Sequence, residues 1–232
     1  MTTRNLGFSL VEIAVVLVII GLLLGGILKG QEMVNSARVR NMADMRAGIS
    51  AAYFGFLDRF RRIPGDWGAL EATAALGVTV NGGGDDNGRI DNPSSAPFVE
   101  PNAVWEQLSK AGFLEGAYDG APGEPTTNNN RTPLNAFNHN VVLGRTPDYV
   151  SKAGSPVRLT LVMGRGIPVN LLRELDVKID DGVPDTGGLR VAVEAGEGAV
   201  FGLIGESLPD CHENGEFKVS SDVQDCNAVY LY

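Results

Sequence analysis

The chain has 232 residues, 44% of them hydrophobic, and a formal net charge of −9. The charge is uneven: residues 1–62 hold eight Lys/Arg and four Asp/Glu, which gives +4, whereas residues 63–232 hold eleven and twenty-four, which gives −13. An acidic surface repels phosphate backbones, so we expect no general nucleic-acid binding by residues 63–232.

The N-terminal region contains a long apolar stretch that begins with one carboxylate. Glu12 is followed by sixteen uncharged residues, 13–28, interrupted only by Gly. As an α-helix, residues 8–28 would span about 30 Å, the thickness of a bilayer core. A carboxylate this deep in hydrocarbon costs roughly 2.5 to 3.5 kcal/mol, so its presence favours a functional role for Glu12.

The order of the segments differs from that of an ordinary secretory signal. Such a signal has a longer basic region before the apolar run and a small-residue cleavage site after it. Here the candidate cleavage residue, Gly7, precedes the run. Removal of a leader peptide of residues 1–7 would therefore leave the apolar helix on the mature chain.

Gly7-Phe8, Glu12 five residues into the mature chain, and the unbroken Ile/Val/Leu stretch resemble the N-terminus of type IV pilins and of type II secretion pseudopilins. In that family, prepilin peptidase cuts after the Gly and methylates the new terminal Phe. The Glu then pairs with the free amine of a neighbouring subunit as the helices bundle into a filament. The resemblance implies that Gly7 is the cleavage residue, Phe8 the methylated terminus and Glu12 the assembly carboxylate. The alternative is a chance Glu near the membrane interface of a plain signal anchor.

The helix is predicted to continue past the membrane span. Apolar residues recur at steps of three or four up to Phe60, and no proline occurs before Pro64, so we expect one helix over residues 8–62. The alternative is a hinge near residues 29–31, because Gly is a weak helix former. The helix is expected to pack on a globular head, residues 63–232, which is large enough for its own core.

The head is predicted to contain short helices and an antiparallel sheet, which makes the fold class α+β, and the resemblance implies that this fold is type IV pilin-like. We expect helices over residues 66–76 and 102–112, capped by Asp66 and Asn102, with Trp105 as a core residue. A further helix is expected over residues 167–175. Alternating or apolar runs predict strands at residues 140–144, 156–163, 189–195, 199–204 and 228–232. Residues 116–140 are expected to form a long loop.

Two acidic segments suggest calcium, which favours closely spaced carboxylate and amide oxygens around a sharp turn. The first candidate set is Asp85, Asp86, Asn87 and Asp91, although the strict calcium-loop pattern fails because Gly83 and Ser94 occupy its first and twelfth positions. The second candidate set is Asp176, Asp180, Asp181 and Asp185. The alternatives are a solvated turn for the first and ordinary hairpin-turn residues for the second. No other cofactor is expected.

Cys211 and Cys226 are fifteen positions apart. In an oxidising compartment they would form a disulfide that stabilises the fold by roughly 3 kcal/mol, whereas in the cytosol they would be two free thiols. The resemblance implies export, since pilins often close a C-terminal loop in this way. The basic residues after the span, including Lys29 and Arg38, point the other way, because the positive-inside rule would place them in the cytoplasm. We follow the cysteines and the resemblance.

The sequence thus predicts a structural filament subunit rather than an enzyme. It contains no His-Glu-x-x-His, Gly-x-Ser-x-Gly or phosphate-loop motif. A minor pilin or pseudopilin is favoured, because Lys29 replaces the proline of many major pilins and the major-pseudopilin pattern Asp-Pro-Trp-Gly-x-Pro-Tyr is absent. The expected partners are other pilin-like subunits, prepilin peptidase, an inner-membrane assembly platform and the lipid bilayer. The expected location is the bacterial inner membrane with a periplasmic head, then a periplasmic or cell-surface filament. The alternative is a signal-anchored periplasmic ligand- or calcium-binding protein outside any filament.

Overall fold

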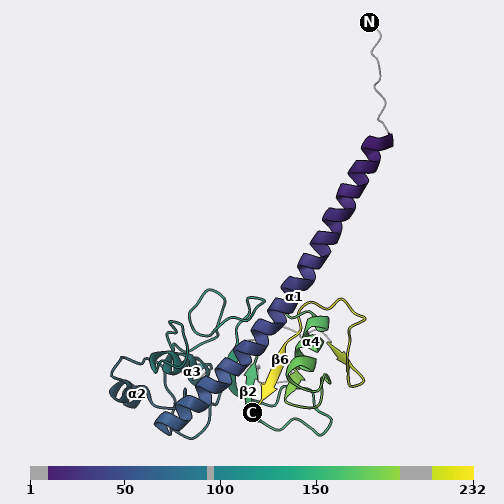
Figure 1. Cartoon of the computed structure of the whole chain (residues 1–232). Helices are drawn as coiled ribbons and strands as arrows, with labels where there is room; N and C mark the ends of the chain where they lie inside the picture. Colours follow the sequence, from purple (N-terminus) through teal and green to yellow (C-terminus); the bar gives the residue numbers. More distant parts are fainter. Residues whose placement is uncertain (1–9, 93–96, 194–210) are drawn as a thin grey trace. The chain divides into compact units, whose positions relative to one another are not determined.

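The computed structural model describes residues 10–92, 97–193 and 211–232. The elements in chain order are α1 (Leu10–Phe60), α2 (Ala69–Leu76), α3 (Val99–Lys110), β1 (Val142–Thr146), β2 (Arg158–Val162), α4 (Val169–Ile179), β3 (Leu189–Val191), β4 (His212–Glu213), β5 (Glu216–Phe217) and β6 (Ala228–Leu231) (Figure 1). The chain divides into two units, Met1–Arg38 and Val39–Tyr232, and α1 contributes to both.

The first unit contains the apolar part of α1. The side chains of residues 10–34 are all exposed, and those of residues 13–28 are all apolar. By length and composition, α1 is the one described helix that could cross a membrane. It is continuous through residues 29–31, so the hinge considered as an alternative is absent from those residues.

The end of α1 follows the pattern expected from the sequence. The helix ends at Phe60, and Arg61 has a positive φ of 55°. Pro64 and Gly65 then turn the chain, since proline cannot continue a helix. Gly65 has φ 92°, and a Cβ there would lie 2.5 Å from Cγ2 of Val104, so the turn requires glycine for both conformation and space.

In the second unit, the described strands form a four-stranded antiparallel sheet in the order β1-β2-β6-β3. The register places Leu143 opposite Leu161, and Tyr230 opposite both Leu161 and Leu189. A separate hairpin pairs β4 with β5. The fold is therefore α+β, with a long N-terminal helix followed by a head containing an antiparallel sheet, and this layout matches a type IV pilin-like fold.

The second half of α1 supplies much of the core of this unit. Its buried residues lie along one face, where positions three, four or seven apart are neighbours: Val39, Met42, Ile49, Ala52, Tyr53 and Phe56. Near its C-terminal end this face packs with Trp67, with Trp105 of α3 and with Leu161 of the sheet. Trp105 is completely buried, which confirms its prediction as a core residue. Nearer Val39 the same face packs with α4, whose Leu172 and Leu175 are also buried.

Alternation along the strands buries both faces of the sheet. Leu161 belongs to the core beneath α1, whereas the next residue, Val162, packs on the opposite face. There it joins Val229 of β6, Phe98 and Tyr149. Such two-sided burial explains why the strands are rich in branched apolar residues.

Two residues predicted as helix caps have other roles. α2 begins only at Ala69, after Gly68, and lacks a side-chain cap, so the prediction of Asp66 as cap was wrong. α3 begins at Val99, so Asn102 lies inside it and not at its end. The Asn102 amide instead donates to the Gly123 carbonyl at 2.8 Å and thereby holds the long loop. In both cases a tertiary partner outweighs the local capping preference.

The other elements differ from prediction mainly in their bounds. The strands predicted at residues 140–144, 156–163, 189–195 and 228–232 correspond to β1, β2, β3 and β6, each shifted or shortened by a few residues. The strand predicted at residues 199–204 lies outside the described residues. The hairpin of β4 and β5 was not predicted, because each of its strands has two residues.

The helix predicted at residues 167–175 is α4, which extends to Ile179. Asp176 consequently lies in its last turn and not in a loop. Residues 181–188 connect this helix to β3 and therefore do not form the tip of a β-hairpin.

We expect Phe56→Ala to lower the free energy of unfolding by about 3–5 kcal/mol, the usual cost of removing a buried aromatic side chain. Phe56 is 0% exposed, and its ring contacts those of Phe60, Trp67 and Phe113. Phe54→Ala is the matched control, since Phe54 lies two residues away and is 52% exposed. Denaturant unfolding of the detergent-solubilised protein would measure both. Equal losses in the two variants would contradict the described core.

Candidate functional site

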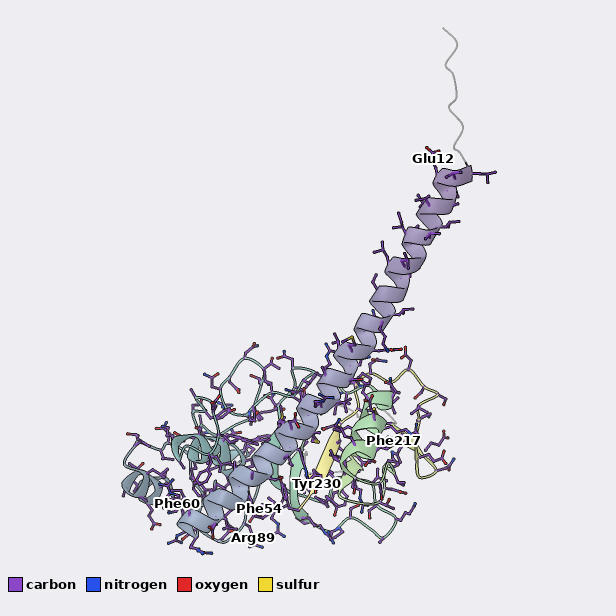
Figure 2. All side chains as sticks on the ribbon, viewed as in Figure 1. Glu12, Phe54, Phe60, Arg89, Phe217 and Tyr230 are labelled. Atoms are coloured by element: carbon purple, nitrogen blue, oxygen red, sulfur yellow. A yellow bond between two sulfur atoms is a disulfide. The ribbon has the colours of Figure 1, made fainter. Side chains whose placement is uncertain are left out.

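The first candidate site is the start of α1, where Glu12 lies in the first turn (Figure 2). Its side chain is exposed, as are the apolar side chains that follow it. An acidic group in a first turn complements the positive end of the helix dipole. Gly7 and Phe8, the predicted cleavage and methylation residues, lie outside the described residues.

A surface of this kind is unfavourable in water. The exposed side chains along residues 13–28 are almost all Ile, Leu or Val, and each would gain about 1.5–3 kcal/mol on burial. The first ion pair along α1 that the structure describes joins Lys29 and Glu32, whose Nζ and Oε2 atoms lie 2.8 Å apart. The helix surface therefore changes from apolar to charged at about Lys29, which is consistent with membrane anchoring of the part before it.

The head contains a group of three carboxylates, here named the first acidic cluster: Asp66, Asp85 and Glu100. One oxygen from each lies within 4.8 Å of the others. Asp66 follows the turn after α1, Asp85 belongs to a glycine-rich loop, residues 82–88, and Glu100 lies in the first turn of α3. Three segments far apart in the sequence thus bring acidic groups together.

Backbone N–H groups satisfy much of this cluster. The two carboxylate oxygens of Asp66 accept from the N–H groups of Asn87 and Gly88 at 2.9 and 2.8 Å. Oε2 of Glu100 accepts from the N–H of Asp91 at 2.6 Å. The cluster therefore also has a structural role, because it fixes the loop against the start of α3.

Burial changes the acidity of Glu100, which is 8% exposed. Its pKa is raised to about 7, mainly because burial disfavours the charged form. The Asp91 N–H offsets part of this rise, and the negative charges of Asp66, Asp85 and Asp91 add to it.

Of the first predicted calcium set, Asp85 lies in the first acidic cluster. Asp86 instead pairs with Arg62, and Asp91 lies 3.6 Å from Nε of Arg89. The Asn87 side chain donates to Asp91 at 3.4 Å. Asp85 is thus grouped with Asp66 and Glu100, whereas Asp86 and Asp91 contact arginines.

The sequence analysis missed Asp66 and Glu100 as members of an acidic cluster. Asp66 was predicted as a helix cap, and nothing local marks Glu100. The only signal in the sequence was the coincidence of an acid just after the Pro64 turn with an acidic, glycine-rich loop.

A second group of carboxylates, the second acidic cluster, contains Asp176, Asp180 and Asp181. These are three of the four residues of the second predicted calcium set. The fourth, Asp185, lies apart from them, and its Oδ1 is 3.2 Å from Nζ of Lys152. The cluster lies where α4 ends and the connection to β3 begins.

Asp176 is the buried member of this cluster, and burial is the main cause that raises its pKa to about 7. Repulsion from the carboxylates of Asp180 and Asp181 adds to the rise. Two groups offset part of this rise in the pKa of Asp176. They are the Gly182 N–H, which does not meet the geometric criteria for a hydrogen bond to Asp176, and the Arg190 guanidinium.

Cys211 and Cys226 form a disulfide with a Cα–Cα distance of 5.9 Å. Both are buried. The bond joins the start of the β4–β5 hairpin to the segment just before β6, where the N–H of Cys226 donates to the Ile167 carbonyl at 2.9 Å. The predicted pairing is present, and it attaches a small hairpin to the core of the head.

Polar residues of α3 that the sequence analysis did not single out hold the loops around the first acidic cluster. Glu106 is completely buried and accepts from the N–H groups of Asn81 and Gly82 at 3.0 and 2.7 Å. Gln107, also completely buried, accepts from the Gly65 N–H and donates to the Gly82 carbonyl. These hydrogen bonds restrict the conformations that the backbone of the glycine-rich loop can adopt.

We expect Glu100→Gln to flatten the fall of the melting temperature between pH 5 and pH 8 in the presence of a chelator. The pKa of Glu100 in the folded protein, about 7, lies above its ordinary value of 4.5. The folded state therefore holds the proton more tightly, so this stabilisation is complete below pH 4.5 and is lost as the pH rises through 7. Differential scanning fluorimetry would measure the profile.

The matched control is Glu115→Gln, since Glu115 is exposed. This control should keep the slope of the parent protein. Identical pH profiles for Glu100→Gln and the parent would contradict the elevated pKa.

Comparison with known proteins bears on the N-terminal site. Residues 2–28 match the family described as the prokaryotic N-terminal methylation motif. No curated protein and no solved structure matches the chain. The matched residues include Gly7, Phe8 and Glu12 and end at Leu28, where the uncharged stretch also ends. The chain therefore carries, at its N-terminus, the prepilin signature of type IV pilin-like proteins.

Proposed function

We propose that this protein is a structural subunit of a type IV pilus-like filament, either a minor pilin or a pseudopilin. The observation that carries the proposal is Glu12 in the first turn of an otherwise apolar, exposed helix, within a matched methylation motif. Neither a soluble domain nor a simple anchor needs a carboxylate at that position.

The proposal assigns a role to each residue of the motif. Prepilin peptidase cleaves after Gly7 and methylates Phe8, and residues 8–28 remain on the mature chain as the membrane anchor. In the filament, the Glu12 carboxylate pairs with the amine of a neighbouring subunit. A buried carboxylate is tolerated where it meets a cation in a bundle that excludes water, and the new terminus supplies that cation.

The same helix serves two environments in succession. Before assembly, the apolar side chains of residues 13–28 lie in the inner membrane, with the head in the periplasm. After assembly, equivalent helices of neighbouring subunits cover them. An oxidising periplasm also suits the disulfide between Cys211 and Cys226.

A structural role also fits the chemistry of the head. Glu100 and Asp176, whose pKa values are raised to about 7, each lie in a cluster made of carboxylates alone. The competing proposal is a signal-anchored periplasmic binding protein outside any filament. The two acidic clusters favour it, and the state of the N-terminus distinguishes it.

We expect the mature protein from its native host to begin at Phe8 with a methylated amine. Intact mass measurement and N-terminal peptide sequencing would both detect this. The chain expressed without prepilin peptidase is the control and should keep residues 1–7. An intact Met1 in a working protein, or cleavage beyond Leu28, would support the anchored binding protein instead.

We expect Glu12→Gln to leave membrane insertion and cleavage intact but to lower incorporation into filaments by at least about tenfold. The change keeps the size of the side chain and removes its charge, so the neighbouring amine loses its partner in a dry bundle. Glu32→Gln is the matched control, because Glu32 lies on the same helix beyond the apolar stretch and pairs with Lys29. Quantitative blotting of sheared filaments against membranes would measure incorporation, and the role fails if both variants assemble as the parent does.

A further inference from the structure

The carboxylate of Asp176 is unusually placed. It lies in the last turn of α4 and is 0% exposed, and neither of its oxygens has a hydrogen-bond partner among the described residues. A buried carboxylate without a partner is destabilising, so such groups normally meet a cation or a donor. The helix dipole adds to the cost, because the C-terminal end of a helix is its negative end.

Two further carboxylates converge on the same place. One oxygen each of Asp176, Asp180 and Asp181 lies within 4.8 Å of the others. Three negative charges this close repel one another, and nothing in their own chemistry would gather them. A shared cation would remove the repulsion and also satisfy Asp176.

The loop holds the other two carboxylates firmly. Oδ2 of Asp180 accepts from the N–H groups of Gly188 and Leu189 at 2.6 and 2.8 Å. A Cβ at Gly187 would lie 1.9 Å from that oxygen, so glycine is needed for Asp180 to approach the backbone. Oδ2 of Asp181 accepts from the Thr186 hydroxyl at 2.6 Å.

The arginine whose charge acts on Asp176 does not replace a cation. Arg190 lowers the pKa of Asp176 by its charge, but its hydrogen bonds go to backbone carbonyls. Its Nε donates to Gly187 at 2.9 Å, and its Nη1 donates to Val150 and Asp185. It therefore braces the loop around the cluster and leaves the Asp176 oxygens without a partner among the described residues.

We propose that a calcium ion binds at the second acidic cluster, held by the carboxylates of Asp176, Asp180 and Asp181. All three supply hard oxygen ligands, which calcium and magnesium prefer. Calcium fits better, because its flexible coordination accepts three converging carboxylates and completes its shell with water or loop carbonyls, whereas magnesium demands a near-ideal octahedron. The ion would tie the end of α4 to the start of β3. This inference does not depend on assembly of the protein into a filament.

The first acidic cluster does not carry the same inference. Both carboxylate oxygens of Asp66 accept backbone hydrogen bonds, and Glu100 accepts one from Asp91. The backbone hydrogen bonds of the loop thus explain why the acids of the first acidic cluster lie together. No such bonds explain the position of the Asp176 carboxylate. The comparison between the clusters supplies an internal control.

The test uses the full chain in detergent micelles, stripped with a chelator and then titrated with calcium. We expect calcium to raise the melting temperature, because an ion that binds the folded state stabilises it by linkage. Magnesium at the same concentration should raise it less. Asp176→Asn should weaken calcium binding by at least about tenfold, measured by calorimetry. Asp85→Asn, in the first acidic cluster, should leave it unchanged.

The metal-free proteins give a second readout. In chelator, Asp176→Asn should melt at or above the temperature of the parent, because it replaces a buried, unpaired charge by a neutral group of the same shape. A structural salt bridge with Arg190 predicts the opposite, a clear fall. Should Asp176→Asn fail to fold, Asp181→Asn at the exposed end of the cluster provides the same calcium titration.

Three results would overturn the proposal. The first is a melting temperature that calcium does not change. The second is a calcium response that survives Asp176→Asn but disappears in Asp85→Asn. The third is a fall in the melting temperature of metal-free Asp176→Asn. Equal stabilisation by magnesium would overturn the assignment to calcium.

Discussion

The apolar side chains of residues 13–28 place the strongest constraint on this protein. They surround α1 on all sides and are exposed in the isolated chain, so water is an unfavourable environment for them. A bilayer or a bundle of like helices removes the cost, but either one makes a carboxylate at the position of Glu12 expensive. A positive charge close to Glu12 would offset that expense in either environment.

The second half of α1 differs in composition from the first, because the head covers one of its faces. Apolar residues such as Ile49 and Phe56 pack into the core of the head, and charged residues such as Asp58 and Arg59 are exposed. The sequence therefore changes along one helix from a surface suited to lipid to a surface suited to a protein core. This change is consistent with one element that anchors the chain in a membrane and also forms the first layer of a folded domain.

Much of the fold could be predicted from patterns that act over short distances. The three- and four-residue spacing of apolar residues predicted α1, Pro64 predicted its end, and alternation predicted β2. The errors arose where distant residues decide the outcome. Asn102 has the chemistry of a cap, but its amide binds a carbonyl of the long loop, so the helix starts three residues earlier. The strands β4 and β5 are too short to show a pattern.

The acidic sites illustrate the same limit. Local spacing was sufficient to predict Asp176, Asp180 and Asp181 as one group, since a single helix end and its loop bring them together. It was insufficient for Asp66 and Glu100, because α3 and the turn after α1 meet only in the folded head. Sequence spacing also suggested Asp185, but the loop turns its carboxylate toward Lys152.

The position of β6 affects how the head can form. This strand is synthesised after β1, β2 and β3, yet it lies between β2 and β3, which do not pair with each other. Among the described strands, β1 and β2 can pair as the polypeptide emerges, but β3 has no partner strand until β6 arrives, although Val191 already accepts a hydrogen bond from the Val150 N–H. Folding must therefore wait for contacts between residues far apart in the chain, which slows it and leaves strand edges available to chaperones in the meantime.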